Sequence, residues 1–291
     1  GSEMCIRDRL ICGAHSFVAA GLSQKLKEEN FAVEYFSRGE NKRIDSVIYG
    51  KYQEIDRNIF FDSKYQTVIN FAVIKDKTVE ANINYIKSLI EFCKKHQVKK
   101  LIHFSSIMVY SYKQKEVNEN TPIETLEETT KRGYGEFKIA VDQYLLSIKD
   151  KLPFELVLVR PGYVLADNRP CPFIKKLPFS ISIIKGNKNS KQPIIRREDI
   201  HQALIKIIKT EKNDSIYHFF PNDNMTKYDY AKQTTKGIIL TMPKWLFKDI
   251  PKFLAKVRII PQSLYSRFEG MYIESHFSSQ KTENKLKIIF N

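Results

Sequence analysis

The chain has 291 residues, 42% of them hydrophobic, and a formal net charge of +15. This length and apolar content exclude a disordered chain and are sufficient for one large α/β domain or two closely joined ones. No apolar run reaches membrane-spanning length and no signal-peptide pattern is present, so a cytoplasmic location is expected. The positive charge indicates an anionic partner or a solvated lysine surface. No compact basic block or nucleic-acid motif occurs, so nucleic acid is not an expected partner.

Residues 1–8 are typical of a tag or of translated vector sequence, so we expect the fold to start at Arg9. The four cysteines and six histidines show no metal-ligand spacing, and no metal site is predicted. We interpret the cysteines as reduced and mostly buried, and the histidines as structural.

Apolar strand-like segments alternate with amphipathic helical segments through most of the chain. Strands are predicted at residues 10–12, 31–36, 46–49, 67–72, 101–104, 154–159 and 216–220. Helices are predicted at residues 22–29, 79–96, 134–149 and 199–209. Because parallel strands need crossover connections, this alternation predicts an α/β fold with a Rossmann-type, doubly wound parallel sheet.

Two stretches, 163–195 and 222–291, break the alternation and are rich in proline, lysine and aromatic residues. We interpret them as a smaller substrate-binding lobe at the carboxyl edge of the sheet, where ligands bind in such folds. The predicted dinucleotide-binding domain then consists of residues 9–162 and 196–221.

The first strand-to-helix turn is a candidate pyrophosphate site, because backbone N–H groups at a helix N-terminus bind phosphate. Of the three glycines expected there, only Gly13 is present, and Ser16 and Ala19 occupy the other two positions. Alanine suits helix–strand packing, and the serine hydroxyl offers a phosphate contact. The cofactor contacts predicted in this turn are Gly13, His15, Ser16, Phe17 and Val18.

Ser37 and Arg38 follow the predicted second strand. An acidic residue there would bind the ribose 2′-hydroxyl of NAD, whereas serine and arginine suit a 2′-phosphate. The pair therefore favours NADP(H) as cofactor, with NAD(H) as the alternative. The remaining interpretation is an ordinary surface arginine after a strand.

Tyr134 and Lys138 lie four residues apart, on one face of a predicted helix. An ammonium so placed lowers the pKa of the phenol, which can then transfer a proton near neutral pH. Ser106 follows the predicted strand 101–104. Separately the three would be interpreted as a buried tyrosine, a solvated lysine and a strand-capping serine; at this spacing they predict a catalytic set.

Together these residues resemble the extended short-chain dehydrogenase/reductase superfamily, and within it the NAD(P)-dependent epimerase/dehydratase family, which acts on nucleotide-activated sugars. The family's serine falls on Ser106 and its Y-x-x-x-K motif on Tyr134 and Lys138, while its H-L-A-A segment falls on Asn70–Val73. The cofactor contacts that the resemblance implies are Phe71, Ala72, Val73, Asn82, Lys138, Pro161 and Val164.

The substrate contacts that the resemblance implies are Ser106, Met108, Tyr163, Gln192 and Arg196. Three of them depart from the family pattern: Tyr163 replaces an asparagine, Gln192 an arginine that often holds the diphosphate, and Arg196 a histidine. Arg196, Arg197 or Lys191 are other sources of positive charge for a phosphate. These departures bear on the substrate class more than on the fold.

The resemblance implies that Tyr134 is the general acid/base, that Lys138 lowers its pKa and holds the nicotinamide ribose, and that Ser106 orients the substrate oxygen. It implies reduction of a 4-keto nucleotide sugar, in surface-polysaccharide synthesis, by a homodimer formed through helices 79–96 and 134–149. Sugar 4,6-dehydration is not expected, because Ile107 and Met108 occupy the positions of the acid/base pair that it needs.

Three alternatives remain open at this point. One is a nucleotide-sugar 4-epimerase with bound NAD. Another is a catalytically silent dinucleotide-binding regulator, which the incomplete glycine turn favours. The third is a membrane-associated reductase of a lipid or steroid-like ketone.

Lysines at 244, 248, 252 and 256 recur every four residues, with aromatic and aliphatic residues between them. This pattern is typical of a helix at a membrane surface or of a lobe helix with a solvated lysine face. Because Pro243 and Pro251 should interrupt a helix, we favour the solvated helix here.

Overall fold

The structure is a computed structural model that describes residues 8–61, 64–75, 78–131, 133–165, 171, 173–261, 264–265, 272 and 275–290. The chain divides into two compact units. Unit 1 contains residues 1–109, 132–161 and 198–217, and unit 2 contains residues 110–131, 162–197 and 218–291. The division differs from the predicted one mainly at 110–131. That segment lies in unit 2, where β7 (Glu116–Val117) pairs with β17 (His276–Phe277).

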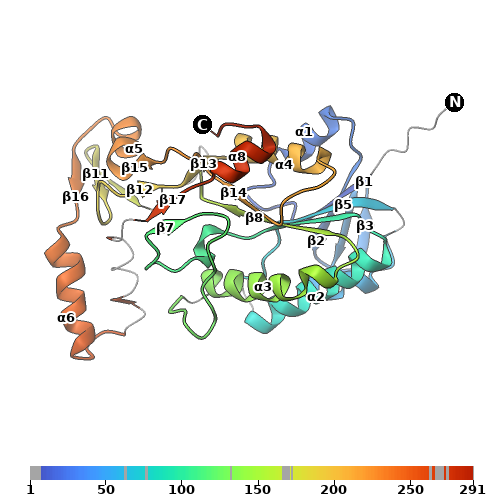
Figure 1. Cartoon of the computed structure of the whole chain (residues 1–291), viewed down its shortest axis with the longest axis horizontal. Helices are drawn as coiled ribbons and strands as arrows, with labels where there is room; N and C mark the ends of the chain where they lie inside the picture. Colours follow the sequence, from blue (N-terminus) through green and yellow to red (C-terminus); the bar gives the residue numbers. More distant parts are fainter. Residues whose placement is uncertain are drawn as a thin grey trace. The chain divides into compact units, whose positions relative to one another are not determined.

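An eight-stranded sheet forms the framework of unit 1, in the order β14-β8-β6-β5-β1-β2-β4-β3 (Figure 1). Its strands are β1 (Asp8–Cys12), β2 (Val33–Arg38), β3 (Lys42–Ile44), β4 (Val47–Gly50), β5 (Tyr65–Asn70), β6 (Lys100–Phe104), β8 (Glu155–Pro161) and β14 (Ile216–Phe219). The pairs that join β8, β6, β5, β1, β2 and β4 are parallel, and β3 is antiparallel to β4. The predicted doubly wound parallel sheet is confirmed.

The helices cover both faces of this sheet, with α2 and α3 on one face and α1 and α4 on the other (Figure 1). They are α1 (Leu22–Glu28), α2 (Val79–Lys95), α3 (Tyr134–Ile148) and α4 (Arg197–Lys209), with short helices η1 (Tyr52–Arg57), η2 (Ile107–Val109) and η3 (Lys149–Lys151). Thr78 caps α2 by accepting a hydrogen bond from the Ala81 N–H at 3.2 Å. Ile86, Leu89 and Cys93 form one face of α2 and are buried in the core. The bounds of all four predicted helices are confirmed within two residues.

The first strand begins earlier than the sequence predicts. β1 starts at Asp8, and Arg9 is buried with its guanidinium 4.4 Å from the Phe31 ring centroid. The Arg9 N–H donates to the Ala32 carbonyl oxygen at 2.8 Å. Arg9 is therefore an integral part of the sheet.

The strand order reverses at β1, because the chain continues to β2 and β4 on one side and to β5, β6 and β8 on the other. Ligands of open α/β sheets bind outside the carboxyl ends of the strands at such a reversal. Cys12 pairs there with Phe36 on one side and with Asn70 on the other. The topology thus brings the ends of β1, β2 and β5 to one edge of the sheet.

Unit 2 contains short strands in small sheets and has its own apolar cluster around Phe173, Ile174, Ile184 and Ala231. Besides β7 and β17, its elements are β9 (Tyr163–Leu165), β10 (Ile174–Leu177), β11 (Ile181–Ile184), β12 (Lys191–Gln192), β13 (Ile194–Arg196), β15 (Met225–Thr226), α5 (Lys227–Thr234), β16 (Ile239–Thr241), η4 (Trp245–Asp249), α6 (Ile250–Lys256) and α8 (Gln280–Leu286). No helix within the described ranges is long and apolar enough to cross a membrane.

A fully buried ion pair joins α3 to β8 in unit 1. Both Nε and Nη2 of Arg160 lie 3.0 Å from Oδ2 of Asp142, and both side chains have zero exposure. If one partner of such a pair is removed, the other charge is left unpaired in an apolar interior. The stability of unit 1 therefore depends on the presence of both partners.

We predict that Asp142→Ala lowers the free energy of unfolding by about 3–5 kcal/mol, because Arg160 would keep a buried charge without its carboxylate. Urea denaturation measures the change. The control is Glu91→Ala on α2, which removes an exposed ion pair with Lys94 and should cost no more than about 0.5 kcal/mol. Equal costs for the two variants would contradict the prediction.

Candidate active site

Ser106, Tyr134 and Lys138 all lie in unit 1, at the junction of β6, η2 and α3. Nζ of Lys138 donates to the carbonyl oxygen of Phe104, the last residue of β6, and lies 5.6 Å from the Tyr134 ring centroid. Ser106 follows β6 by two residues, and its Oγ accepts from the Met108 N–H at 3.2 Å. Since α3 packs against η2, the predicted catalytic residues are neighbours in the structure.

The start of α3 determines how Tyr134 is presented. Gly133 precedes the helix with φ = +64°, a conformation that favours glycine, and its N–H donates to the Glu136 carboxylate at 3.3 Å. Tyr134 is the first helical residue and is 40% exposed, whereas Ser106 and Lys138 are buried. The phenol is therefore accessible, while the groups beside it are held in place.

Burial lowers the pKa of Lys138 to about 8. Asp142, one turn further along α3, raises the pKa and opposes this effect, while Lys75 lowers it slightly. With a pKa of about 8 the ammonium is still mostly protonated at neutral pH. It can thus stabilise negative charge on the neighbouring phenol.

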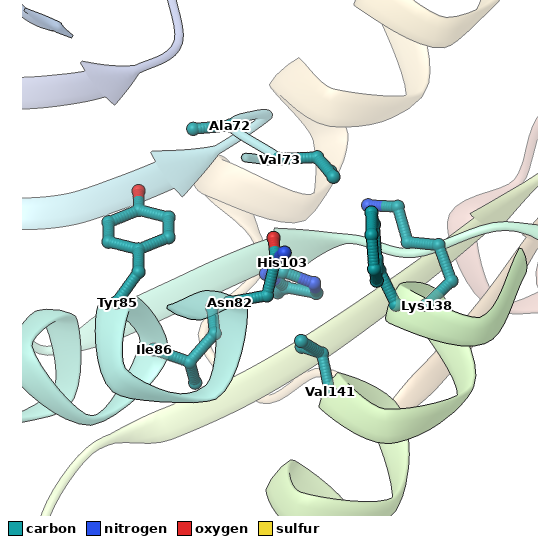
Figure 2. Close-up of a pocket in the computed structure, with 9 residues that line it drawn as sticks. Ala72, Val73, Asn82, Tyr85, Ile86, His103, Lys138 and Val141 are labelled. Carbon is teal, nitrogen blue, oxygen red and sulfur yellow. The ribbon is translucent and has the colours of Figure 1, made fainter. Parts of the chain in front are cut away.

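A small pocket lies beside Lys138, between the sheet and helices α2 and α3 (Figure 2). Its lining includes Ala72, Val73, Asn82, His103 and Lys138. Figure 2 shows His103 on β6, between Tyr85 on one side and Lys138 on the other. The predicted cofactor residues Ala72, Val73, Asn82 and Lys138 thus line one pocket.

His103 belongs to a chain of buried hydrogen bonds. The Tyr85 hydroxyl and the Ala72 N–H both donate to Oδ1 of Asn70, at 2.7 and 3.0 Å. The Asn70 amide nitrogen is therefore directed at Nδ1 of His103, 2.9 Å away. Because this amide nitrogen can only donate, Nδ1 must accept, and the proton of a neutral ring sits on Nε2.

The imidazole of His103 is neutral, because burial, helped by the charge of Lys138, lowers its pKa well below 6.5. Its Nε2 has no hydrogen-bond partner among the described residues. The result is a buried N–H donor next to the predicted catalytic lysine. Sequence reasoning assigned His103 a purely structural role. The sequence signal was its position inside the otherwise apolar strand predicted at residues 101–104, and the structure shows all five residues of β6 to be buried.

The turn after β1 differs from a glycine-rich turn that leads straight into a helix. Residues 13–21 form successive turns in which the N–H groups of Ser16, Ala19 and Leu22 donate to the carbonyl oxygens of Gly13, Ser16 and Ala19. Oγ of Ser16 also accepts from the Ala19 N–H at 3.2 Å. The helix α1 begins only at Leu22, so its N-terminus does not follow Gly13 directly.

Gly13 itself meets a strict requirement. Its φ is +78°, and a Cβ atom there would lie 2.8 Å from the backbone nitrogen of Ala72. Gly13 thus allows the end of β1 to approach the segment after β5, which carries the predicted contacts Phe71, Ala72 and Val73. Of the other predicted contacts in this turn, His15 is exposed, and Phe17 and Val18 are partly buried. Val18 accepts a hydrogen bond from Nε2 of His201 at 2.8 Å.

Ser37 and Arg38 end β2 at the same edge of the sheet. The Ser37 hydroxyl is buried and has no hydrogen-bond partner within the described part of the chain, and Arg38 is exposed. A hydroxyl and a guanidinium at this edge fit the 2′-phosphate of an adenosine ribose. The preference for an NADP-type dinucleotide that these two residues indicate stays a prediction.

Asn82 has a clear local task. Its side chain accepts from the Ile74 N–H at 2.9 Å and donates to the carbonyl oxygens of Ile74 and Thr78, both at 3.0 Å. It thereby holds the segment that follows Val73. Phe71 packs on Phe104 with ring centroids 4.3 Å apart. Pro161 ends β8 and is buried. For these residues direct contact with a cofactor stays a prediction.

The remaining predicted substrate contacts lie in unit 2, except Met108, which lies in η2 of unit 1. β9 and β13 pair in parallel, with Tyr163 opposite Ile194, Val164 opposite Ile195, and Leu165 opposite Arg196. Gly162 permits this pairing, since a Cβ there would lie 2.0 Å from the Pro193 carbonyl oxygen. The family resemblance also places the last glycine position of an R-P-G-x-V-x-G segment, residues 160–166, at Ala166, which lies outside the described residues.

The side chains of these unit 2 residues have distinct surroundings. Arg196 is exposed, and Nε2 of Gln192 donates to the Ser190 hydroxyl at 2.9 Å. Burial raises the pKa of Tyr163. Lys191 forms an exposed ion pair with Asp223, and so is only partly available to a phosphate. Among the described residues no group of three or more His, Cys, Asp or Glu side chains could hold a metal ion.

The fold and this site define a Rossmann-type protein of the extended short-chain dehydrogenase/reductase class. The model of the NAD dependent epimerase/dehydratase family matches residues 9–217, and the chain belongs to that family. The sequence has no match among curated proteins.

Solved structures share the fold over nearly the whole chain. One is a short-chain dehydrogenase/reductase superfamily protein from Agrobacterium tumefaciens with bound NAD (12% identity, TM-score 0.72, 98% of this chain and 93% of that one). Others are the dTDP-glucose 4,6-dehydratase of Bacillus anthracis in complex with NAD (14%, 0.69, 98% and 92%) and the UDP-N-acetylglucosamine 4-epimerase of Bacillus cereus (14%, 0.69, 98% and 94%). At such identities the likeness is one of fold.

We predict that Lys138 makes stability depend on pH between about 8 and 10.5, its folded and ordinary pKa values. In that window the unfolded chain binds the proton that the folded protein has lost, so stability rises with pH. Urea denaturation should show wild type gaining stability over Lys138→Met as the pH rises through this window. Burial also lowers the pKa of Lys227 to about 8, but Lys227 is present in both proteins, so its contribution to the stability difference cancels. A constant difference would contradict the prediction.

Proposed function

We propose that this protein is an NADP(H)-dependent reductase of a 4-keto nucleotide sugar. The observation that carries the proposal is the arrangement of an accessible Tyr134, a buried Lys138 and a buried Ser106 at one strand end. Family membership supports the nucleotide sugar and the dinucleotide. Similar solved structures include a dTDP-glucose 4,6-dehydratase in complex with NAD and a protein in complex with UDP-glucose and NAD.

In this proposal the Tyr134 hydroxyl donates its proton to the substrate carbonyl oxygen. The Lys138 ammonium stabilises the phenolate that remains, and the Ser106 hydroxyl donates a hydrogen bond to the same oxygen and fixes its direction. A reduced dinucleotide, when bound, would supply the hydride for the carbonyl carbon, so that the carbonyl becomes an alcohol. Lys138, Phe71, Ala72 and Val73 would hold the nicotinamide end, and Gly13, Ser37 and Arg38 the adenosine and phosphate end.

Elimination of water from the sugar needs an additional acid and base beside the serine. Ile107 and Met108 stand there in η2, and neither can transfer a proton. The site therefore favours simple proton and hydride transfer over 4,6-dehydration. A 4-epimerase with bound NAD is the second candidate, which the family and the fold of the Bacillus cereus epimerase support.

A catalytically silent dinucleotide-binding protein is the third candidate. The turns at residues 13–21 favour it, because α1 does not begin at the glycine turn. The intact Ser106, Tyr134 and Lys138 set argues against it. A homodimer through α2 and α3, which lie side by side on one face of the sheet, belongs to the proposal as well.

We expect purified protein to bind NADPH and NADP⁺ more tightly than NADH and NAD⁺ in parallel titrations. Arg38→Ala should weaken binding of the phosphorylated forms about tenfold or more, by removing a charge-assisted hydrogen bond, with little effect on NAD⁺. The control Arg57→Ala removes an exposed arginine of η1 and should change neither. Tight NAD⁺ binding would shift the assignment to the epimerase, and failure to bind any form would leave the silent protein.

We also expect oxidation of NADPH by some member of a panel of 4-keto nucleotide sugars. Tyr134→Phe should lower kcat about 10²- to 10⁴-fold, because the general acid is lost while the ring remains. The dissociation constant for NADPH should stay within about threefold. Tyr144→Phe changes a tyrosine of the same helix away from the site and should retain activity. Undiminished turnover by Tyr134→Phe would rule out this mechanism.

A further inference from the structure

One helical segment of unit 2 exposes an unusual number of large apolar side chains. The π-helical turn η4 runs directly into α6, in orange in Figure 1, and the backbone of Asp249 and Ile250 at the join is helical. Trp245 is 61% exposed and Phe253 63% exposed. Leu246, Ile250 and Val257 are also exposed. Pro251 lies in the first turn of α6, where a missing N–H is tolerated, so the prolines do not break this segment.

The exposed residues form a stripe, and a different stripe holds the helix to unit 2. Ile250 and Phe253 of α6 and Val257, the residue directly after it, follow i, i+3, i+7 spacing and lie on one side of the helical segment. Pro251 is buried and Leu254 partly buried, so these contact the protein. The Tyr272 hydroxyl secures the entry to the helix by donating to the Met242 carbonyl oxygen at 3.1 Å. The exposed apolar stripe therefore belongs to a helix whose other side is attached to unit 2.

Basic side chains accompany this stripe. Lys244, Lys252, Lys256 and Arg258 are exposed, Lys248 is partly exposed, and Asp249 is the only acidic residue between positions 244 and 258. Lysine stems can lie along an apolar surface while their ammonium groups stay in water. A surface that is both apolar and strongly positive needs a partner that is both apolar and negative.

We propose that the helical segment 244–257 docks this protein onto an anionic lipid bilayer. Trp245, Ile250 and Phe253 would enter the boundary between headgroups and acyl chains, and the lysines would meet lipid phosphates. A second copy of the chain fits less well, because a two-fold symmetric contact through this helix would place lysines against lysines. This proposal is independent of the reaction at Tyr134.

Trp245 is the only tryptophan of the chain, so its fluorescence reports directly on the proposed contact. We expect a blue shift and co-sedimentation with vesicles of phosphatidylglycerol and phosphatidylcholine, but not with phosphatidylcholine alone. High salt should weaken binding, because the electrostatic contribution is screened. No shift and no sedimentation with the anionic vesicles at low salt would overturn the proposal.

Two variants separate this surface from the general positive charge of the protein. Replacing Lys244, Lys252 and Lys256 by Gln should weaken vesicle binding at least about tenfold. The matched control replaces the exposed Lys27, Lys99 and Lys113 by Gln, which removes the same charge elsewhere. Equal weakening by the two triple variants would show non-specific attraction and overturn the proposal.

The double variant Ile250→Ser, Phe253→Ser should abolish vesicle binding and the blue shift of Trp245 fluorescence. Both side chains are exposed, and an unchanged thermal unfolding midpoint would show that the fold is retained. Light scattering tests the second copy as occupant. A dimer that this double variant dissociates, in a protein that does not bind vesicles, would overturn the membrane proposal in favour of self-association.

Discussion

The burial of a lysine ammonium at the end of β6 is the constraint on which the candidate site depends. A charged group removed from water is costly unless neighbouring groups replace its hydration. The Phe104 carbonyl accepts a hydrogen bond from Lys138, and Asp142 supplies a negative charge one turn along α3. Asp142 is in turn bound by the buried Arg160 of β8. The groups that keep Lys138 in place therefore also attach α3 to the sheet.

The same burial sets the charge available for chemistry. The ammonium of Lys138 is mostly protonated at neutral pH, while His103, also buried, is neutral. The pocket thus holds one positive charge, matched to the one negative charge that a phenolate at Tyr134 would carry. His103 adds an N–H donor of fixed orientation, because Asn70 and Tyr85 determine its tautomer. If His103 were also charged, its repulsion would raise the free-energy cost of burying the Lys138 ammonium.

Much of unit 1 was predictable because its signals are local and strong. The buried strands β5, β6 and β8 each contain a short run of apolar residues, and the spacing of Tyr134 and Lys138 needs only helical geometry. The network of His103 was not predictable, since it depends on contacts between residues far apart in the sequence. Strand pairing sets Asn70 opposite His103, and Tyr85 reaches Asn70 from helix α2. Unit 2 was predicted only as a lobe. Its strands of two to four residues are too short to show a recognisable alternation of apolar and polar positions.

The incomplete glycine motif in the turn after β1 changes which contacts can hold a dinucleotide at this edge of the sheet. The N–H groups of Ser16, Ala19 and Leu22 are already donated within the turn, and α1 starts well after Gly13. The usual attraction of a helix N-terminus for a pyrophosphate is therefore reduced. A dinucleotide bound at this edge would rely more on its other contacts. An additional phosphate on the adenosine ribose, facing Arg38 and the buried hydroxyl of Ser37, would supply such a contact. On this reasoning the incomplete glycine turn and the proposed preference for NADP are two aspects of one arrangement.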